Sequence, residues 1–184
     1  DVVAGGVGAT YDCTDNFKLL AGFHRGFSPP SPRGATGQET GGTRLEEEEA
    51  LASEFGFRYL NADRALGTQL IYFYTHFNDL IVTDILATGG GTGDDENVGK
   101  IFSTGLELGI QYDPGLDRNW KFSNPWFLTA TYTNARLLND VNSANPESYF
   151  AGGKRGNWVP YIPEWTFTMG SGVHFELIGF DLTG

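Results

Sequence analysis

Hydrophobic and polar residues alternate along most of this chain with a period of two. The longest run of this kind covers residues 165–177. Successive side chains of a β-strand point to opposite faces, so the run predicts one strand with an apolar face and a small or polar face. The apolar set is Trp165, Phe167, Met169, Ser171, Val173, Phe175 and Leu177, and the other set is Thr166, Thr168, Gly170, Gly172, His174 and Glu176.

The same alternation recurs along the chain and predicts about seven strands. The other six are expected at residues 2–11, 17–25, 51–60, 66–76, 98–112 and 126–136. Residues 77–85 are expected to continue the strand that begins at Leu66, and residues 180–183 to begin a further strand. The segments between the strands are rich in Gly, Pro, Asp and Asn, which is typical of turns and loops.

The predicted connections alternate in length. They are short at 12–16 and 61–65, moderate at 113–125, and long at 26–50, 86–97 and 137–160. Short turns on one side and long loops on the other are typical of an outer-membrane β-barrel, whereas a soluble sandwich has no reason to separate them. The pattern therefore predicts an all-β fold, a transmembrane antiparallel β-barrel.

The polar face of these strands contains charged residues, which a packed core excludes and a wet lumen tolerates. These residues are Lys18, Glu54, Arg58, Glu107 and Glu176. We therefore expect Phe167, Met169 and Val173 to face lipid, and Thr168, Gly170 and His174 to face the lumen. Aromatic residues at the strand ends are expected to form girdles at the two membrane interfaces, namely Tyr112, Trp126, Tyr132, Trp165 and Phe175.

Composition narrows the class further. The aromatic content of 14% and the 26 glycines favour an all-β protein with many turns. A net charge of −11 argues against a nucleic-acid partner. The single cysteine, Cys13, permits no internal disulfide. The sequence contains no apolar run of ~18 residues that would predict a transmembrane helix. The chain begins at Asp1 and ends at the start of an expected strand, so we expect a fragment of a longer protein.

Five segments together resemble the TonB-dependent outer-membrane receptors, and most of all their ferric-dicitrate-type subgroup. They are RGFSPPSP at 25–32, EEEEALASEFGFRY at 46–59, IYFYTHFNDLI at 71–81, NVGKIFSTGLELGIQY at 97–112 and VPYIPEW at 159–165. Each motif is loose by itself. Their order and spacing over nearly the whole chain make the resemblance fairly specific.

The resemblance implies a 22-stranded barrel filled by an N-terminal plug. Residues 1–184 would be a partial barrel domain, an internal slice of about seven strands without the plug. The implied function is TonB-dependent uptake of a ferric chelate, a siderophore or ferric dicitrate, across the outer membrane of a Gram-negative bacterium. The implied partners are outer-membrane lipid and lipopolysaccharide, the ferric chelate, and the TonB complex acting through the plug. Nothing in the family pattern implies a cofactor.

Other functions remain open from the residues alone. A non-transport outer-membrane barrel, serving as a structural, adhesion or assembly component, would carry the same strand pattern. A soluble β-sandwich binding module is a third class. The sequence contains no G-x-S-x-G, H-E-x-x-H or P-loop motif, so we expect no catalytic residues and no enzymatic activity.

Possible metal ligands are better explained by ordinary roles. His24, His76 and His174 lie on three different predicted strands, where polar lumen or boundary positions are favoured over a metal pair. GGTGDD at 90–95 fits one copy of a Ca²⁺-binding repeat, but such sites need stacked copies, and a flexible acidic loop is favoured. The block 46–49 is expected to have a structural role, pairing with an arginine such as Arg58. No metal site is predicted.

Positive residues in the long loops are the candidates for binding an anionic chelate. Guanidinium groups bind carboxylates with two parallel hydrogen bonds. Aromatic side chains near residues 154–155 are expected to form walls of the site, including Tyr149, Phe150 and Tyr161. The candidate ligand-binding residues are Arg33, Arg44, Arg136, Lys154, Arg155 and Trp158.

Overall fold

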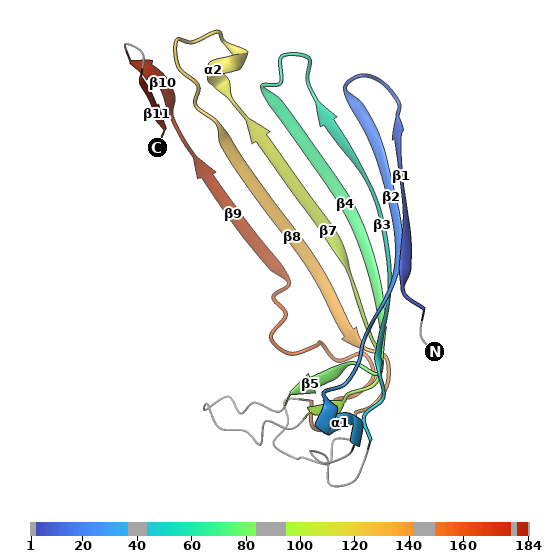
Figure 1. Ribbon diagram of the computed structural model, residues 1–184. Coiled ribbons are helices and arrows are strands. Elements are labelled where there is room, and N and C mark those ends of the chain that lie inside the picture. The colour runs from blue at the N-terminus through green and yellow to red at the C-terminus, as the bar shows by residue number, and fades with distance from the viewer. Residues whose placement is uncertain (1–2, 37–43, 84–94, 142–149, 178–179, 184) are drawn as a thin grey trace.

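The computed structural model describes residues 3–36, 44–83, 95–141, 150–177 and 180–183, and these form a curved antiparallel sheet (Figure 1). The main sheet has the order β1-β2-β3-β4-β7-β8-β9. Neighbouring long strands follow one another along the chain, as predicted for an up-and-down barrel wall. The strands of this sheet are β1 (Gly5–Asp12), β2 (Phe17–Ser28), β3 (Glu48–Leu60), β4 (Leu66–Asn78), β7 (Ile101–Tyr112), β8 (Trp126–Leu137) and β9 (Trp165–Ser171).

Short elements lie beyond both ends of this sheet. Two pairs of short strands form separate two-stranded sheets, β5 with β6 and β10 with β11. Within the described residues, neither helix has the length or hydropathy needed to span a membrane. These elements are α1 (Pro32–Thr36), β5 (Ile81–Thr83), β6 (Asp95–Asn97), α2 (Pro114–Asp117), β10 (His174–Leu177) and β11 (Phe180–Thr183).

The connections are segregated by length, as the sequence predicts. Residues 13–16, 61–65 and 113–125 join strands at one end of the sheet, which we call the turn end. Residues 29–47, 79–100 and 138–164 join strands at the opposite end, which we call the loop end (Figure 1).

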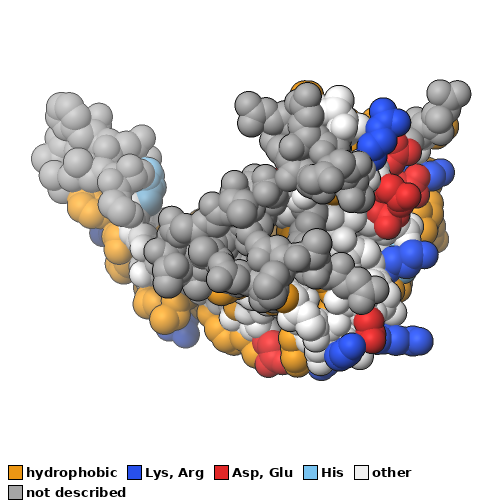
Figure 2. Space-filling view, turned by 90° about the horizontal axis from the view of Figure 1, so that it is seen from below, with side chains coloured by type: hydrophobic (Ala, Val, Ile, Leu, Met, Phe, Trp, Pro, Cys, Tyr) orange, Lys and Arg blue, Asp and Glu red, His pale blue; other side chains and the backbone are white. Residues whose placement is uncertain are grey.

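Strand register divides the side chains between two faces. Residues that are paired from strand to strand lie on the same face of the sheet. The face that contains the mostly apolar row listed below is called the outer face. The sheet forms an open arc, with hydrophobic side chains along its convex side (Figure 2). On β9, Phe167 and Met169 are 66% and 83% exposed. Across the sheet, the row comprises Ala21, Phe55, Tyr72, Leu106, Tyr132 and Trp165.

The opposite, inner face is largely polar. Thr168 and Gly170 lie on this face of β9, paired with Thr129 and Phe127 of β8. The predicted division of β9 between an apolar and a polar face is therefore confirmed at these positions. Phe127 lies flat on the inner wall, since a Cβ at Gly170 would come within 2.6 Å of its ring.

The prediction of one continuous strand over 165–177 is wrong. β9 ends at Ser171, and β10 begins at His174 and pairs with β11 instead. The backbone N–H of Gly172 donates to the Pro125 carbonyl, and His174 forms a β-bridge with Ser123. These contacts redirect the chain, so the facing of Val173 and His174 does not follow from β9. The expected strand at 180–183 is present as β11.

The predicted extension of β4 over 77–85 is also wrong. β4 ends at Asn78, and Asp79 adopts a left-handed conformation with φ of 53° that turns the chain away. β5 then pairs with β6, which lies within the expected loop 86–97. β7 starts at Ile101 rather than at Val98. β2 and β3 are each three residues longer at the loop end than predicted.

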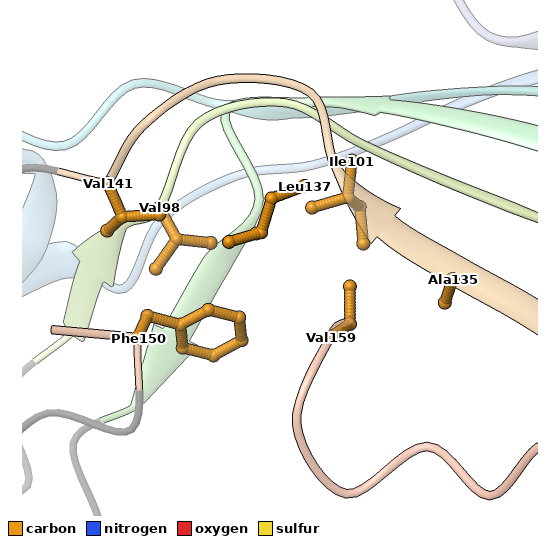
Figure 3. Packing of buried hydrophobic residues seen from close by; sticks show 7 residues of the cluster. All are labelled: Val98, Ile101, Ala135, Leu137, Val141, Phe150 and Val159. Atoms are coloured by element: carbon orange, nitrogen blue, oxygen red, sulfur yellow. The ribbon is translucent and has the colours of Figure 1, made fainter. Parts of the chain in front are cut away.

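A small apolar cluster closes the loop end of the inner face (Figure 3). It joins the ends of β7 and β8 to residues from the long loops. Phe77, Leu80 and Val82 pack against it while partly exposed. This cluster therefore holds the bases of two long loops onto the sheet. Its buried members are Val98, Ile101, Ala135, Leu137, Val141, Phe150 and Val159.

Candidate ligand-binding and lumen-facing surfaces

The inner face has a charged half and a hydroxyl-rich half. On β2 and β3, Lys18, His24, Glu54 and Arg58 occupy inner positions and are exposed or half-buried. The Arg58 guanidinium donates to Gln69 Oε1 from Nε at 3.0 Å and from Nη2 at 2.7 Å. This half of the described inner face thus offers charged partners of both signs.

The half built from β7, β8 and β9 presents hydroxyl groups. In the described residues its charged inner-face position is Glu107, which is exposed and pairs in register with Thr131. Threonine is favoured on strands, and its hydroxyl both donates and accepts. The inner-face threonines of this half are Thr129, Thr131, Thr133, Thr166 and Thr168.

Two open depressions lie on the inner face. One, of about 390 Å³, is lined by Arg58, Gln69 and Thr129, and its floor includes the side-chain-free Gly67 and Gly109. A smaller one, of about 250 Å³, is lined by residues that include His24 and Glu54. Both present polar groups in a shallow wall, which suits contact with another polypeptide or a passing solute.

At the loop end, residues 157–159 run alongside β8. The Leu137 N–H donates to the Asn157 carbonyl at 2.9 Å, and the Val159 N–H donates to the Ala135 carbonyl at 3.1 Å. Between them, Arg136 and Trp158 form a β-bridge. The loop therefore returns along the edge of β8, joined to it by an isolated β-bridge.

Arg136 and Trp158 form a stacked pair. The guanidinium carbon of Arg136 lies 4.0 Å from the Trp158 ring centroid. Arg136 also donates from Nε to Asn134 Oδ1 at 3.0 Å and from Nη1 to the Gly156 carbonyl at 2.8 Å. A guanidinium over an indole face is attracted by the ring quadrupole. This pair therefore fixes residues 154–159, which we call the loop leg, against β8.

Lys154 and Arg155 lie on the same leg, held through Asp140. The Arg155 backbone N–H donates to Asp140 Oδ1 at 2.9 Å, and Lys154 Nζ lies 3.1 Å from Asp140 Oδ2. The backbone hydrogen bond from Arg155, followed by that from the Lys154 ammonium, lowers the pKa of Asp140 below its ordinary value. Both cationic residues are exposed.

The six candidate residues fall into two groups. Arg136, Lys154, Arg155 and Trp158 lie together on β8 and the adjoining loop leg. Arg44 lies by α1, because its Nε donates to the Ala35 carbonyl at 3.0 Å.

Arg44 lines a depression of about 600 Å³ together with four carboxylate residues, Glu46, Glu47, Glu49 and Asp79. Negative surroundings of this kind disfavour an anionic ligand. Arg33 belongs to α1, and its side chain lies outside the described part of the structure.

The aromatic residues that were expected to form the walls of the binding site do not lie together. Phe150 is buried in the loop-end cluster, 9% exposed, and so supports the loop rather than lining a surface. Tyr161 is 76% exposed and has a left-handed φ of 62°. Tyr149 lies outside the described residues, as does most of the GGTGDD motif.

The expected pairing of the acidic block with an arginine is confirmed, but the arginine is Arg25 and not Arg58. Arg25 Nη2 lies 2.8 Å from Glu49 Oε1, whereas Arg58 pairs with Gln69. Glu49 and Arg58 lie near opposite ends of β3, about 30 Å apart at roughly 3.3 Å per residue.

The structural role expected of the acidic block is supported by its backbone contacts. Glu48 Oε2 accepts from the Ile81 N–H at 3.1 Å, and Asn97 Oδ1 accepts from the Glu46 N–H at 2.9 Å. These contacts fasten the start of β3 to the neighbouring loop.

The three histidines are not grouped. His24 lies on the inner face, and His76 lies on the outer face, where its Nε2 is 3.2 Å from Asn78 Oδ1. His174 is at the turn end, bridged to Ser123. Among the described residues, no set of three or more His, Cys, Asp or Glu side chains is arranged to hold a metal ion.

Sequence reasoning missed one organising residue, Asp113. Its carboxylate is buried, 7% exposed, and accepts from the backbone N–H groups of Gly115, Leu116 and Asn124 at 2.8, 3.2 and 2.9 Å. It also accepts from the Ser123 hydroxyl. The Asp-Pro-Gly sequence, with Asp as N-cap and Pro as first helical residue, is the signal that could have revealed it.

Burial acts to raise the pKa of Asp113, but these hydrogen bonds outweigh it. The Ser123 hydroxyl, followed by the three backbone N–H groups, stabilises the carboxylate. The pKa therefore lies below its ordinary value, and the group is ionised at neutral pH.

A curved antiparallel sheet with an exposed apolar outer face, a polar inner face and segregated loops defines a segment of an outer-membrane β-barrel. The family described as TonB dependent receptor-like, beta-barrel matches residues 1–183. The chain belongs to this family, and its place is the outer membrane of a Gram-negative bacterium. The resemblance of its motifs to the TonB-dependent receptors is thereby confirmed at the level of the family.

Similar proteins include the pesticin receptor of Yersinia enterocolitica, which is 26% identical over 165 residues. These cover 90% of this chain and 21% of that receptor, so the chain spans about a fifth of the length of the curated relatives it matches. Two solved structures share the fold. The ferric yersiniabactin uptake receptor FyuA from Yersinia pestis has a TM-score of 0.62 at 21% identity, covering 98% of this chain and 24% of that one. The ferric citrate transporter FecA has a TM-score of 0.58 at 22% identity, covering 97% and 24%.

Proposed function

We propose that residues 1–184 are part of the barrel domain of a receptor that takes up a ferric chelate, a siderophore or ferric dicitrate, by TonB-dependent transport. The observation that carries this proposal is the exposed polar inner face of the sheet, together with the exposed cations Lys154 and Arg155 at the loop end. Iron chelates are named for two of the similar structures, FyuA and FecA. The plug and the TonB complex are the partners proposed outside this chain.

The loop end supplies groups suited to an anionic chelate. Lys154 and Arg155 are exposed cations, and the stacked Arg136 and Trp158 lie on the same leg of the loop. Carboxylate and catecholate groups bind cations through charge-assisted hydrogen bonds, which are about twice as strong as neutral ones. We propose that these four residues contact the ligand first. Arg33 and Arg44 are proposed as weaker contributors, because carboxylates surround Arg44.

The inner face supplies groups suited to a plug and to passage. Glu54, Arg58 and Glu107 project exposed charges toward the barrel interior, where ion pairs with the plug would be shielded from bulk water. The threonines of β8 and β9 offer weak, exchangeable hydrogen bonds along the same wall. Such a surface allows a hydrophilic chelate to pass without tight retention.

Uptake of iron-55 by cells with and without the gene for the full-length receptor tests this function. The chelates to supply are ferric citrate and ferric yersiniabactin, each in cells with and without TonB. We expect uptake of at least one chelate to require both the receptor and TonB. Uptake that does not change on deleting the receptor, for every chelate, would favour a non-transport barrel.

A pair of variants tests the proposed binding surface. The double substitution Lys154→Ala and Arg155→Ala removes two loop-end cations and is expected to weaken chelate binding by about a hundredfold or more, since hydrogen bonds to charged groups contribute about 1.5–3 kcal/mol each and two are lost. The matched control is Lys100→Ala with Arg64→Ala, which removes the same charge from other exposed positions. Equal loss in both variants would show a nonspecific charge effect and remove these residues from the binding surface.

A further inference from the structure

The connection between β7 and β8 differs from the other turns at its end of the sheet. Residues 13–16 and 61–65 are short, whereas residues 113–125 include a helix and expose large apolar side chains. Leu116, Trp120 and Phe122 are 50%, 41% and 42% exposed. Turns are ordinarily built from small and polar residues. A solvent-exposed cluster of large apolar side chains in a turn therefore indicates an interaction site.

This turn is held in a fixed shape. The buried Asp113 carboxylate binds three backbone N–H groups and the Ser123 hydroxyl, which ties the start of the turn to its end. Asn124 Nδ2 also donates to the Gly172 carbonyl at 2.7 Å, and Ser123 bridges to His174. The apolar side chains are therefore presented by a defined frame.

Aromatic and cationic groups are interleaved on this turn. The Trp120 and Phe122 ring centroids lie 5.1 Å apart, and the Arg118 guanidinium lies 5.8 Å from the Trp120 ring centroid. Lys121 is exposed between the two aromatic residues. Amphipathic rings beside long cationic side chains are the composition that the membrane interface favours, because the rings enter the lipid while the cations reach the headgroups.

The two ends of the turn adjoin the outer, lipid-facing surface of the sheet. Tyr112 and Trp126 are paired outer-face residues at the turn end. The Tyr112 hydroxyl donates to Asp117 Oδ2 at 2.8 Å, and Trp126 Nε1 donates to Asn124 Oδ1 at 2.8 Å. Both ends of the turn are thus fastened to the aromatic rim of the lipid-facing surface.

We propose that this turn is a membrane anchor that binds phospholipid of the periplasmic leaflet. Short turns face the periplasm in outer-membrane barrels, which places the turn end beside that leaflet. Leu116, Trp120 and Phe122 enter the interface between headgroups and acyl chains. Arg118 and Lys121 bind the headgroup phosphates, matching positive groups to negative ones. This inference rests on the outer-membrane fold and is independent of which chelate is carried.

Depth-dependent fluorescence quenching tests the anchor. The full-length receptor, with Cys13 and any other native cysteine replaced by Ser, is labelled at Phe122→Cys with the fluorophore NBD and placed in nanodiscs of phosphatidylethanolamine and phosphatidylglycerol. Lipids with a nitroxide on the headgroup or deep in the acyl chain are the quenchers. We expect NBD at 122 to be quenched at least threefold more by the headgroup nitroxide than NBD at Asp63→Cys, a matched exposed position in a short turn.

Two further labels keep the result interpretable. Phe167→Cys, on the lipid-facing surface of β9, should be quenched most by the deep nitroxide. Leu116→Cys leaves the aromatic pair intact and should give the same result as position 122.

Quenching at 116 and 122 no stronger than at 63 would overturn the proposal. A blue-shifted, unquenched label would do the same, because it would place the cluster against protein. The double substitution Arg118→Gln and Lys121→Gln is expected to weaken the headgroup quenching at position 122. Unchanged headgroup quenching in this variant would show that Arg118 and Lys121 do not contact the phosphates.

Discussion

The two ends of the sheet are held by different forces. At the turn end, one buried carboxylate, Asp113, organises the longest turn through directional hydrogen bonds. At the loop end, a cluster of aliphatic side chains and Phe150 adds apolar contact to the hydrogen bonds that hold residues 153–159 to β8 and the residues that follow it. Hydrogen bonds fix one geometry, whereas apolar burial is non-directional and tolerates several. We predict from this comparison that the turn end keeps one geometry, whereas the loop end, which depends in part on apolar burial, can adopt more than one.

Trypsin offers the same measurement at both ends. Arg118 and Lys121 are cleavage sites in the turn, and Lys154 and Arg155 are cleavage sites in the loop. Cleavage requires local opening of the surrounding segment, so its rate reports the local free energy of unfolding at each end. Each end then serves as the control for substitutions at the other.

The largest effect is expected from Phe150→Ala at the loop end. Phe150 is 9% exposed and packs with Leu137 and Val141. Truncating a buried Phe costs about 3 kcal/mol or somewhat more, which corresponds to roughly a hundredfold increase in local opening. Cleavage at residues 154–155 should rise by that order, while cleavage at 118–121 stays unchanged. Equal cleavage of wild type and variant at 154–155 would show that the cluster does not hold the loop.

The next largest effect is expected from Asp113→Ala at the turn end. This substitution leaves the buried N–H group of Gly115 and the partly buried N–H group of Asn124 without their acceptor, at a cost of about 1–3 kcal/mol. Cleavage at Arg118 and Lys121 should rise about tenfold to a hundredfold, and cleavage at 154–155 should not change. A rise at both ends would mean that the two ends are coupled and that the comparison fails.

Acid should lower the local stability of the turn at residues 113–125 by protonating Asp113. Its pKa is lowered in the folded state from an ordinary value of about 3.9. The stabilisation is therefore fully present above about pH 4 and is lost as pH falls below that value through the folded pKa. Hydrogen exchange at the Leu116 and Asn124 amides, corrected for its intrinsic pH dependence, should show this loss. Asp113→Asn should abolish the pH dependence, and its persistence in that variant would assign it to another group.

Much of the sheet could be predicted from the sequence, because alternation at period two follows directly from strand geometry. The outward Phe167 and Met169 and the inward Thr168 are examples. Strand ends were harder to predict, since they depend on contacts between distant residues. Residues 165–177 alternate without interruption, yet Gly172 bonds to Pro125 and ends the strand. No pattern within 165–177 encodes a contact with residue 125.

The candidate site was predictable as residue types but not as an arrangement. Positive charge in the long loops predicts Arg136, Lys154 and Arg155 as ligand-binding residues, and the structure brings residues 154–158 beside Arg136. The stack of Arg136 on Trp158 depends on the register of the returning loop, which the sequence does not reveal. Arg58 is not the partner of the acidic block, although it is close to the block in sequence. Both belong to β3, and the extended strand places them near its opposite ends.

The smallest effect is expected from breaking the Arg136–Trp158 stack. Arg136 is half-buried and lies 4.0 Å from the ring centroid, so the contact contributes about 1 kcal/mol. Arg136→Lys keeps the charge but loses the planar stack and the hydrogen bond from the guanidinium to Gly156. Cleavage at 154–155 should rise about threefold to tenfold, well below the effect of Phe150→Ala. If Arg136→Lys equals Phe150→Ala, then a directional contact holds the loop end as well, and the predicted freedom of the loop end is wrong.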